Sequence, residues 1–419
     1  MWMEYIPCFL EEIIILGFFM AIQLSDRVQR VKPSPTLAIS ALAQQLAAEG
    51  RDIINLGVGQ PDFPTPAHIK DAGIAAITNN NTGYTAVDGI PELKDAIIKK
   101  FKRDNQLNYE PDQILVSCGG KQSFSNLCQA LLNDGDEVII PAPYWVSYPD
   151  MVLLAGGVPV IVEAGQSSNF KLTADMLENA ITDKSRLFVI NSPSNPTGVS
   201  YSKSELAALG EVLMKYPDII VATDDMYELI LFGNLDITEG EQKVFSNILN
   251  ETPELVDRCV VLNGVSKAYA MTGWRIGYAG GPVELIKGMK KIQGQSTSNP
   301  TSISQYAAVD ALNGDQTCLR PMLKAFKERH DFVVKALNAI DGVDCLPSDG
   351  TFYSFPNVEG LIARVDGVST DTELAEHLLD KTGVALVPGS AFGLSGHIRL
   401  SFATSMENLE KSIERIASL

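Results

Sequence analysis

The chain has 419 residues, of which 45% are hydrophobic and 20% charged. This composition predicts a folded protein with room for one large unit or two domains. The formal net charge of −18, with no basic run to offset it, argues against nucleic acid or an anionic membrane as a partner. The six scattered cysteines form no C-x-x-C pair, so we expect free thiols in a reducing cytoplasm and no metal site.

The N-terminal segment is hydrophobic but does not resemble a membrane span or an export signal. Residues 13–24 read IIILGFFMAIQL, which is uncharged but too short to cross a bilayer. The preceding residues are acidic, whereas a secretory signal begins with positive charge. We therefore expect translation to start at Met20 and residues 1–19 to be an artefact of start-site assignment. The alternative is a short membrane-associating segment.

Short apolar runs alternate with amphipathic helical patterns through the middle of the chain. The runs are ILVSC (114–118), DEVIIP (136–141), VPVIVE (158–163), RLFVIN (186–191), DIIVATDD (218–225) and CVVLNGV (259–265). Helical patterns at 121–132 and 203–216 lie between some of them. This alternation predicts an α/β fold with a buried, mostly parallel sheet between helices. Ligand sites in such sheets lie beyond the carboxyl ends of the strands, so SCGG, NSPSNPTG, TDDMY and GVSK should share one edge.

The last hundred residues have a different pattern. A charged helical stretch at 317–340 precedes short strands at 351–356 and 397–403, and a final helix is expected at 405–419. This order predicts a smaller α+β domain at 311–419, a large domain at 66–310, and an N-terminal arm at 20–65 that contributes to the small domain.

Two of the strand ends could contact a flat, phosphorylated ligand. The stretch SCGGKQ (117–122) ends a strand and opens a helix, where glycines and free N–H groups suit a phosphate. An ordinary strand–helix turn, with Lys121 as a helix cap, is the alternative. In PAPYWVSYPD (141–150) an aromatic ring such as Trp145 could stack on a flat ligand, or the rings could simply cover the core.

The remaining strand ends carry polar and charged groups. Asn195 lies in the loop NSPSNPTG and offers both a donor and an acceptor, although the loop by itself could be an ordinary turn. Asp224, followed by Tyr227, would be costly at a buried strand end unless it meets a cation such as a protonated ring nitrogen, although a helix cap is the alternative. Lys267 follows the strand CVVLN, where desolvation would make it a reactive amine, and Arg275 suits a phosphate.

Taken together, these groups match the needs of one cofactor, pyridoxal 5′-phosphate. Its aldehyde takes a lysine as a Schiff base, its pyridinium needs an acid, and its phosphate needs a cradle. The ordered set GGKQ, PAPYWVSYPDM, NSPSNPTG, DDMYE, NGVSKAYAMTGWRIGYAGGP and HIRLSFATS resembles the class I aminotransferases from about Leu24 to the end. It is most similar to the bacterial aspartate aminotransferase branch, some of whose members also accept prephenate.

The resemblance implies a role for each residue around the cofactor ring. Lys267 would form the Schiff base and, once freed by substrate, move the proton between Cα and C4′. Asp224 would pair with the pyridine nitrogen, Tyr227 and Asn195 would bond the phenolic oxygen, and Trp145 would stack on the ring. These roles make Lys267, Asp224 and Tyr227 the expected catalytic residues of a fold type I pyridoxal-phosphate enzyme.

The phosphate contacts implied by the resemblance include one from a second subunit. Gly120, Lys121 and Arg275 would contact the phosphate. Tyr84 resembles the tyrosine that reaches the phosphate of the neighbouring subunit, which implies a homodimer with shared sites. The chain departs from the animal and enteric enzymes at Gly264, where they have a serine that helps to hold the phosphate.

On the substrate side, the resemblance implies contacts to two carboxylates. Arg399 would grip the α-carboxylate by a two-point bond and Gly59 would contact it through the backbone, with Trp145 and Asn195 beside them. The partner-chain arginine that binds the distal carboxylate in the animal and enteric enzymes is absent from GQSTSNP (294–300). Lys32 occupies the position linked to dicarboxylates in the bacterial branch, and a solvated charge is its alternative reading.

The implied reaction is a ping-pong transamination that converts L-aspartate and 2-oxoglutarate to oxaloacetate and L-glutamate, with prephenate to arogenate as a further activity. The alternatives are an aminotransferase for alanine or aromatic amino acids, or a C–S β-lyase. A transcriptional regulator with an aminotransferase-like domain is disfavoured because no basic DNA-binding module precedes Leu24.

Overall fold

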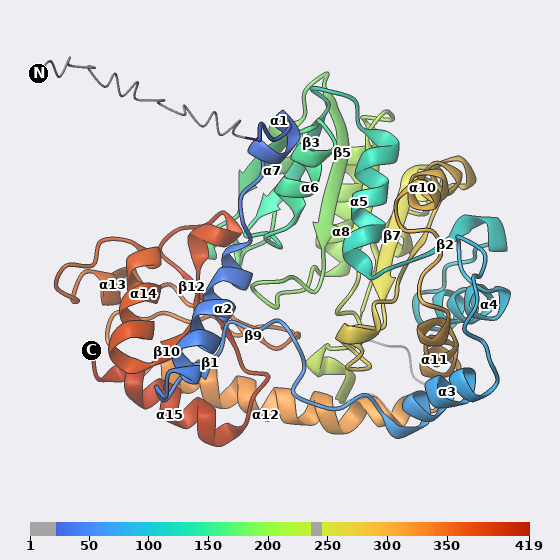
Figure 1. Cartoon of the computed structure of the whole chain (residues 1–419). Coiled ribbons are helices and arrows are strands. Elements are labelled where there is room, and N and C mark those ends of the chain that lie inside the picture. The colour runs from blue at the N-terminus through green and yellow to red at the C-terminus, as the bar shows by residue number, and fades with distance from the viewer. Residues whose placement is uncertain (1–21, 236–244) are drawn as a thin grey trace, which may run out of the picture.

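The computed structural model describes residues 22–235 and 245–419. The expected start at Met20 and the segment 1–19 lie outside the described residues. Figure 1 shows a large sheet flanked by helices and, beside it, a second group of helices and short strands formed by both ends of the chain. The long helix α12 (Arg320–Leu337) runs below both parts. The boundaries predicted for the domains, at residues 66 and 311, stay a prediction.

The large sheet has seven strands in the order β2-β8-β7-β6-β5-β3-β4. They are β2 (Ile114–Ser117), β3 (Glu137–Ala142), β4 (Val158–Glu163), β5 (Ser185–Asn191), β6 (Ile220–Asp224), β7 (Cys259–Gly264) and β8 (Gly277–Gly280). Strand β8 is antiparallel to both of its neighbours, and the other pairs are parallel. All six apolar runs are confirmed as strands, and the α/β fold with a mostly parallel sheet is confirmed with them.

Strand β8 has no counterpart among the predicted strands because its sequence, GYAG, has few strand-forming side chains. Its composition follows from close packing. A Cβ on Gly277 would lie 2.3 Å from the backbone nitrogen of Gly120, so the start of helix α5 and this strand touch backbone to backbone.

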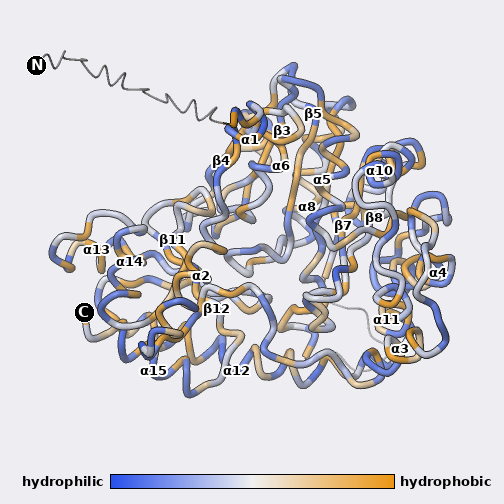
Figure 2. The backbone as a smooth tube through the Cα atoms, in the orientation of Figure 1, coloured by the Kyte–Doolittle hydropathy of each residue, from blue (hydrophilic) through white to orange (hydrophobic). Residues whose placement is uncertain are grey.

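Helices cover both faces of the large sheet. On one face, buried residues of α5 (Gly120–Leu131), α6 (Tyr148–Leu154) and α10 (Val283–Ser296) pack against alternate strand residues such as Leu187 and Val189. On the other face, α4 (Pro91–Lys100), α7 (Ala174–Ala180) and α8 (Lys203–Met214) pack with Phe188 and Ile190. The strands are therefore apolar on both faces. Figure 2 shows stretches of hydrophobic residues, such as those of β5, as orange tube in the interior.

The second part of the molecule is built from segments far apart in the sequence. Strands β11 (Val387–Pro388), β12 (Ile398–Ser401) and β9 (Tyr353–Ser354) form an antiparallel sheet, and β1 (Ile54–Asn55) pairs in parallel with β10 (Val384–Ala385). The two predicted C-terminal strands are confirmed at shorter length. The predicted helix at 317–340 begins as a 3₁₀ turn (Gln316–Leu319) and continues as α12.

The remaining helices complete these layers. They are α1 (Asp26–Gln29), α2 (Pro35–Ala48), α3 (Ala67–Thr78), α9 (Ile248–Glu251), α11 (Ser302–Asn313), α13 (Glu359–Ile362), α14 (Asp371–Thr382) and α15 (Met406–Ala417). None of the helices in the described residues has the length and apolar character needed to cross a bilayer. The five cysteines in the described residues are free thiols, and Cys8 lies outside them.

The strand register brings the polar strand ends to one edge. Asn191 at the end of β5 pairs with Asp224 at the end of β6. Gly264 at the end of β7 and Ser117 at the end of β2 both pair with Gly277 at the start of β8. The predicted meeting of these motifs at one edge is confirmed.

Candidate active site

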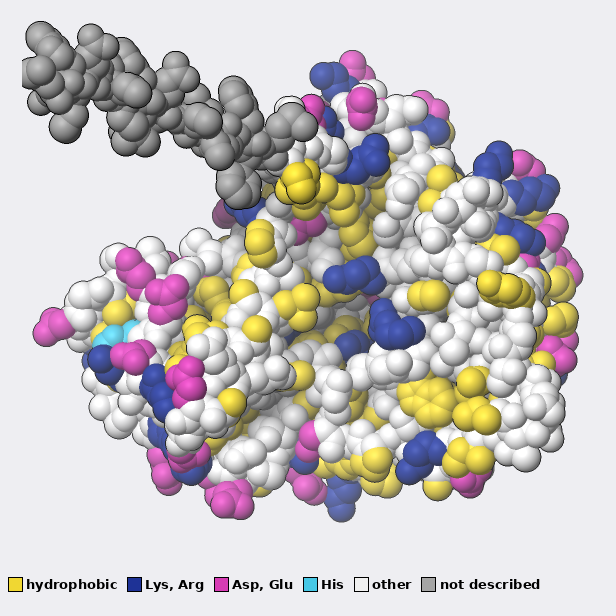
Figure 3. Space-filling model, in the orientation of Figure 1, with side chains coloured by type: hydrophobic (Ala, Val, Ile, Leu, Met, Phe, Trp, Pro, Cys, Tyr) yellow, Lys and Arg dark blue, Asp and Glu magenta, His cyan; other side chains and the backbone are white. Residues whose placement is uncertain are grey.

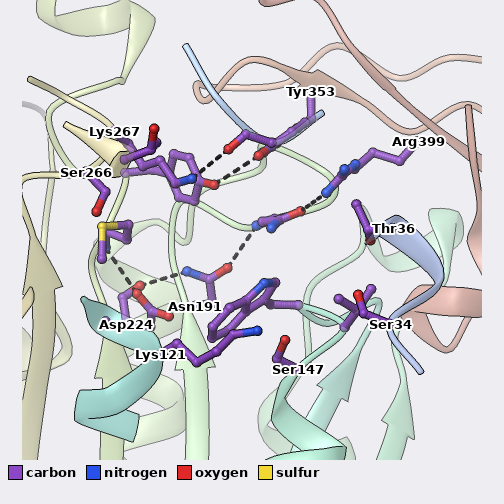
Figure 4. Close-up of a pocket in the computed structure, with 18 of the residues that line it drawn as sticks. Ser34, Thr36, Lys121, Ser147, Asn191, Asp224, Ser266, Lys267, Tyr353 and Arg399 are labelled. Carbon is purple, nitrogen blue, oxygen red and sulfur yellow. Dashed lines mark hydrogen bonds between the residues drawn. The ribbon is translucent and has the colours of Figure 1, made fainter. Parts of the chain in front are cut away.

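A cavity of about 380 Å³ lies at this edge, between the large sheet and the second part of the molecule. Figure 3 shows the hollow on this face, with Lys and Arg side chains gathered in it. Ten of the twelve predicted site residues line the cavity: Gly59, Gly120, Lys121, Trp145, Asn195, Asp224, Tyr227, Lys267, Arg275 and Arg399. In the close-up of Figure 4, Lys267, Asp224 and Arg399 come from different elements and point toward the same space.

Lys267 lies three residues beyond the end of β7. Its Nζ donates a hydrogen bond of 2.6 Å to the carbonyl oxygen of Gly59. Burial, with smaller contributions from the cations Arg399 and Arg275, lowers its pKa to about 8. About one-tenth of the amine is therefore neutral at pH 7, and the neutral form is the one that attacks a carbonyl or accepts a proton.

Asp224 presents its carboxylate at the end of β6. Its Oδ2 accepts a hydrogen bond of 2.5 Å from the Tyr148 hydroxyl, and its Oδ1 accepts one of 3.2 Å from the Met226 backbone N–H. Burial raises the pKa of the carboxyl, although both hydrogen bonds and Lys267 oppose that rise. The bond to Met226 is a local turn contact, while Tyr148 fixes the other oxygen. A cation placed in the cavity would stabilise the charged form of this buried carboxylate.

A chain of amide groups connects Asp224 with Arg399. Asn191 donates from Nδ2 to the Asp224 carbonyl at 2.8 Å and accepts from the Asn195 backbone N–H at 2.8 Å. Arg399 Nη1 then donates to Asn195 Oδ1 at 3.0 Å. The Asn195 side chain is therefore held in one orientation at the cavity wall, and Figure 4 shows these bonds as a row of dashed lines.

Arg399 is a buried guanidinium with only 2% of its surface exposed. Besides Asn195, it donates from Nη2 to the Gly57 carbonyl at 2.7 Å, and its Nε has no hydrogen-bond partner. Since a guanidinium has five N–H donors, three remain free. Burial lowers the pKa of Arg399, but an arginine keeps its charge in a protein. These three unpaired N–H groups of Arg399 could bind a carboxylate.

The glycine turn before α5 forms a cradle with Arg275. A Cβ on Gly119 would lie 2.3 Å from Arg275 Nη2, so a side chain at this position would displace the guanidinium. Gly119 has φ +87° and Arg275 has φ +58°, both in the left-handed region. Arg275 is held by the carbonyls of Thr272 (3.0 Å) and Cys118 (3.2 Å). With the free N–H groups at the start of α5, this arrangement fits a phosphate.

Lys121 and Trp145 lie together on the neighbouring wall. The Lys121 Nζ is 5.3 Å from the centroid of the Trp145 ring. Burial and the charge of Arg275 lower the pKa of Lys121. Lys121 therefore faces the cavity as a partly desolvated cation, which differs from the helix cap offered as its alternative.

The cavity is cationic although the chain as a whole is acidic. Four basic side chains, Lys121, Lys267, Arg275 and Arg399, line it together with one carboxylate, Asp224. Within the described residues, none of the four forms an ion pair, which leaves a formal charge of +3 when Lys267 is protonated. Such a cavity in a chain of net charge −18 selects ligands with several negative charges.

The two other predicted site residues lie outside this cavity. Lys32 lines a neighbouring groove of about 700 Å³, and its backbone N–H donates to Asp150 Oδ1 at 3.4 Å. From the same segment, Ser34 and Thr36 line the cavity instead. Tyr84 is 94% exposed. The roles predicted for Lys32 and Tyr84 stay predictions.

The structure also adds site residues that sequence reasoning missed. Tyr148 appeared only as one ring of an aromatic loop, but its hydroxyl holds Asp224. Asn191 is the first letter of NSPSNPTG, and its position at a strand end was the available signal. Tyr353 and Ser266 line the cavity as well. Ser266 belongs to the motif GVSK that was expected at this edge, whereas no sequence pattern indicated Tyr353.

Known proteins share both the sequence and the fold. A family model described as "Aminotransferase class I and II" matches residues 51–416. An aspartate/prephenate aminotransferase of Nitrosomonas europaea is 59% identical over 402 residues, covering 95% of this chain and 99% of that protein.

Solved structures agree with this similarity. An aspartate aminotransferase from Rhizobium meliloti matches with a TM-score of 0.90 and 48% identity, over 95% of this chain and 98% of that one. The Thermus thermophilus aspartate aminotransferase with maleate matches with a TM-score of 0.87 and 41% identity, over 94% and 99%. The predicted resemblance is confirmed, and the chain belongs to the class I and II aminotransferases, enzymes that depend on pyridoxal 5′-phosphate.

Proposed function

We propose that this enzyme transfers the amino group of L-aspartate to 2-oxoglutarate in a ping-pong cycle, with oxaloacetate and L-glutamate as products. The observation that carries the proposal is the cavity in which four cations surround one carboxylate. The cofactor phosphate and two substrate carboxylates would supply the missing negative charge. Relatives named aspartate aminotransferase, including one from Geobacillus stearothermophilus that is 48% identical, support the choice of donor.

Pyridoxal phosphate supplies an aldehyde that an amine can capture and a protonated ring that withdraws electrons from the reacting carbon. We infer that the phosphate is held by the α5 N-terminus at Gly120 with Lys121 and Arg275. The Trp145 ring would cover one face of the cofactor. Tyr227 and Asn195 would donate to its ring oxygen.

The proton on the reacting carbon requires a base that is neutral at working pH. Lys267, with a pKa of about 8, supplies more of this neutral form near neutral pH than an ordinary lysine, because burial disfavours its charged form. Its bond to the Gly59 carbonyl holds the amine at the cavity wall. Asp224 would pair with the protonated ring nitrogen, and Tyr148 fixes the carboxylate that makes this pair.

The substrate carboxylates have separate proposed partners. Arg399 would bind the α-carboxylate by a two-point contact through two of its three free N–H groups, next to the Gly59 backbone. Lys32 would act on the distal carboxylate. It lies beside the cavity rather than in its wall, so its side chain would have to reach across from the segment that contains Ser34 and Thr36.

We also propose a cytoplasmic homodimer in which Tyr84 completes the partner's phosphate site. The exposure of Tyr84, with Ile74 and Ile77 exposed on α3, supports an interface on this side. The free thiols support a reducing compartment.

A second amino acceptor, prephenate, is proposed from the relatives. The proteins from Nitrosomonas europaea and Cereibacter sphaeroides, 59% and 54% identical, carry the name aspartate/prephenate aminotransferase. The chain would then convert prephenate to arogenate with aspartate or glutamate as donor.

Half-reaction spectra of the purified holoenzyme test both proposals. Aspartate and glutamate should discharge the cofactor absorbance at least about tenfold more efficiently than alanine or phenylalanine. Oxaloacetate and prephenate should each restore it. A preference for alanine or phenylalanine would contradict the aspartate assignment, and release of pyruvate and ammonia from cystathionine would identify a β-lyase instead.

A further inference from the structure

Tyr353 lies between Tyr227, on the proposed cofactor side of the cavity, and Arg399, on the proposed substrate side. It belongs to β9, and in the antiparallel pair with β12 it stands opposite Ser401. Arg399 is two residues from Ser401 on β12, so Arg399 and Tyr353 share one face of the sheet. The Arg399 guanidinium lies 4.5 Å from the centroid of the Tyr353 ring. The ring therefore forms a platform under the group that is free to bind a carboxylate.

The hydroxyl of Tyr353 points to the other half of the cavity. Its Oη lies 3.1 Å from the Oη of Tyr227, and both side chains are buried, with 1% and 4% of their surfaces exposed. Within the described residues, neither hydroxyl has another hydrogen-bond partner in the protein. Figure 4 shows this contact between Tyr353 and the cavity wall that carries Lys267.

The same hydroxyl also packs on the loop that receives the Lys267 amine. A Cβ on Gly59 would lie 2.9 Å from Tyr353 Oη, so glycine is needed for the hydroxyl to sit there. Gly59 is the residue whose carbonyl accepts the bond from Lys267. The Tyr353 side chain thus contacts three groups of the proposed site: the Tyr227 hydroxyl, the Arg399 guanidinium and Gly59, whose carbonyl binds Lys267.

The number of protons on the two hydroxyls indicates which one donates in the hydrogen bond between Tyr353 and Tyr227. Each hydroxyl has one proton and can also accept. If Tyr227 donates its proton into the cavity, then Tyr353 must donate to Tyr227, because otherwise the Tyr227 proton would be used between the two rings. Donation from Tyr353 also makes Tyr227 a stronger donor through cooperativity.

We propose that Tyr353 is a positioning residue that directs the Tyr227 hydroxyl toward the cofactor oxygen and supports Arg399 for the substrate carboxylate. This inference rests on the proposed function, because it needs the cofactor oxygen beside Tyr227. The hydroxyl of Tyr353 serves the cofactor side and its ring serves the carboxylate side. The two contributions are therefore separable by substitution.

Two variants of Tyr353 and one double variant test the proposal in the holoenzyme. Tyr353→Phe removes the hydroxyl and keeps the ring, whereas Tyr353→Leu removes both. Tyr201→Phe is a matched control, since Tyr201 is also buried and its hydroxyl accepts a hydrogen bond of 2.8 Å from the Leu172 backbone, away from the cavity. The measurements are the pH midpoint of the cofactor's visible absorbance, the Kd of maleate, and the melting temperature.

Donation from Tyr227 favours the anionic form of the cofactor oxygen, so weaker donation raises the pH midpoint. Tyr353→Phe should raise it by about 0.3 pH unit and change the maleate Kd less than about twofold. Tyr353→Leu should raise the midpoint similarly and weaken maleate by about 3- to 30-fold. In a Tyr227→Phe background, Tyr353→Phe should add no further shift. Tyr201→Phe should change only the melting temperature.

Other outcomes would overturn the proposal. An unchanged midpoint in Tyr353→Phe, or the same shift in the Tyr227→Phe background, would show that the hydroxyl does not act through Tyr227. An unchanged maleate Kd in Tyr353→Leu would remove the role of the ring, and if this variant does not fold, the double-variant comparison decides alone. Failure of the wild-type enzyme to turn over aspartate would refute the proposed function. If the wild-type enzyme and Tyr353→Phe are both active and have the same pH midpoint, only the role of Tyr353 is refuted.

Discussion

Replacement of Arg399 by lysine is the substitution that most directly tests how the cavity binds its substrate. Lysine keeps the positive charge but replaces a planar fork with a single ammonium group. The structure leaves three N–H groups of Arg399 free while two others hold Asn195 and Gly57. A lysine at this position cannot satisfy both of those acceptors and also present two parallel donors to a carboxylate.

The expected loss follows from that count. A hydrogen bond to a charged group contributes about 1.5–3 kcal/mol. Losing one of two such bonds, with some displacement of the substrate, should cost about 2–4 kcal/mol of transition-state binding. At about 1.36 kcal/mol per factor of ten, kcat/KM for aspartate should fall about 30- to 1,000-fold.

Steady-state kinetics with aspartate and 2-oxoglutarate, together with the Kd of maleate, would measure the loss. Arg258→Lys is the matched control, since Arg258 also donates to backbone carbonyls, those of Leu213, Tyr216 and Ile219, but lies away from the cavity. It should lower the melting temperature without changing kcat/KM. The cofactor absorbance of Arg399→Lys should remain, because the phosphate cradle is untouched.

A fall in kcat/KM of less than about threefold in Arg399→Lys would refute the two-point contact. Equal losses in Arg399→Lys and Arg258→Lys would show that the effect comes from general destabilisation rather than from the carboxylate.

Further predictions concern the lysines and the buried acid. Lys267→Ala should lose the visible absorbance of bound cofactor and nearly all turnover, and retained turnover would end its assignment. Because the pKa of Lys267 in the cofactor-free chain is about 8, cofactor capture should accelerate as pH rises through 8, with a rate at pH 7 about one-tenth of the plateau, and a flat profile from pH 6 to 9 would contradict the lowered pKa. Asp224→Ala should keep the cofactor but lower kcat more than about 100-fold, and an unchanged kcat would exclude its pairing with the ring nitrogen. Lys32→Ala should reduce turnover of aspartate more than that of alanine, with Arg30→Ala in the same groove as the control, and equal losses for both substrates would remove Lys32 from the specificity site.

Much of the large sheet was predictable because its signals are local. Each buried strand is a short apolar run, and the polar residue at its end follows directly in the sequence, as Asp224 follows IVAT and Lys267 follows CVVLNGVS. Parallel strands place their carboxyl ends at one edge, so a list of strand ends becomes a list of neighbours. Strand β8 was not predictable in this way, since its glycines reflect contact with the backbone of α5 rather than a strand-forming pattern.

The contacts that tune the site were harder to predict because they join residues distant in the sequence. Tyr148 donates to Asp224 across 76 positions, and Arg399 donates to Asn195 across 204. The lowered pKa of Lys267 depends first on burial, which is a property of the packed molecule. The hydrophobic periodicity of a sequence does not indicate such pairs of distant residues.

The α/β class, the cofactor and the residues at the strand ends could be predicted from the sequence, because they depend on side-chain chemistry and on patterns within one element. Which of those residues share a cavity could be seen only in the folded chain. The fold placed Lys32 in an adjoining groove and brought Tyr353 between Tyr227 and Arg399. Distance and burial depend on contacts between β9 or β12 and the loops that follow β5 and β6, such as Tyr353 with Tyr227 and Arg399 with Asn195, and only the folded chain contains that information.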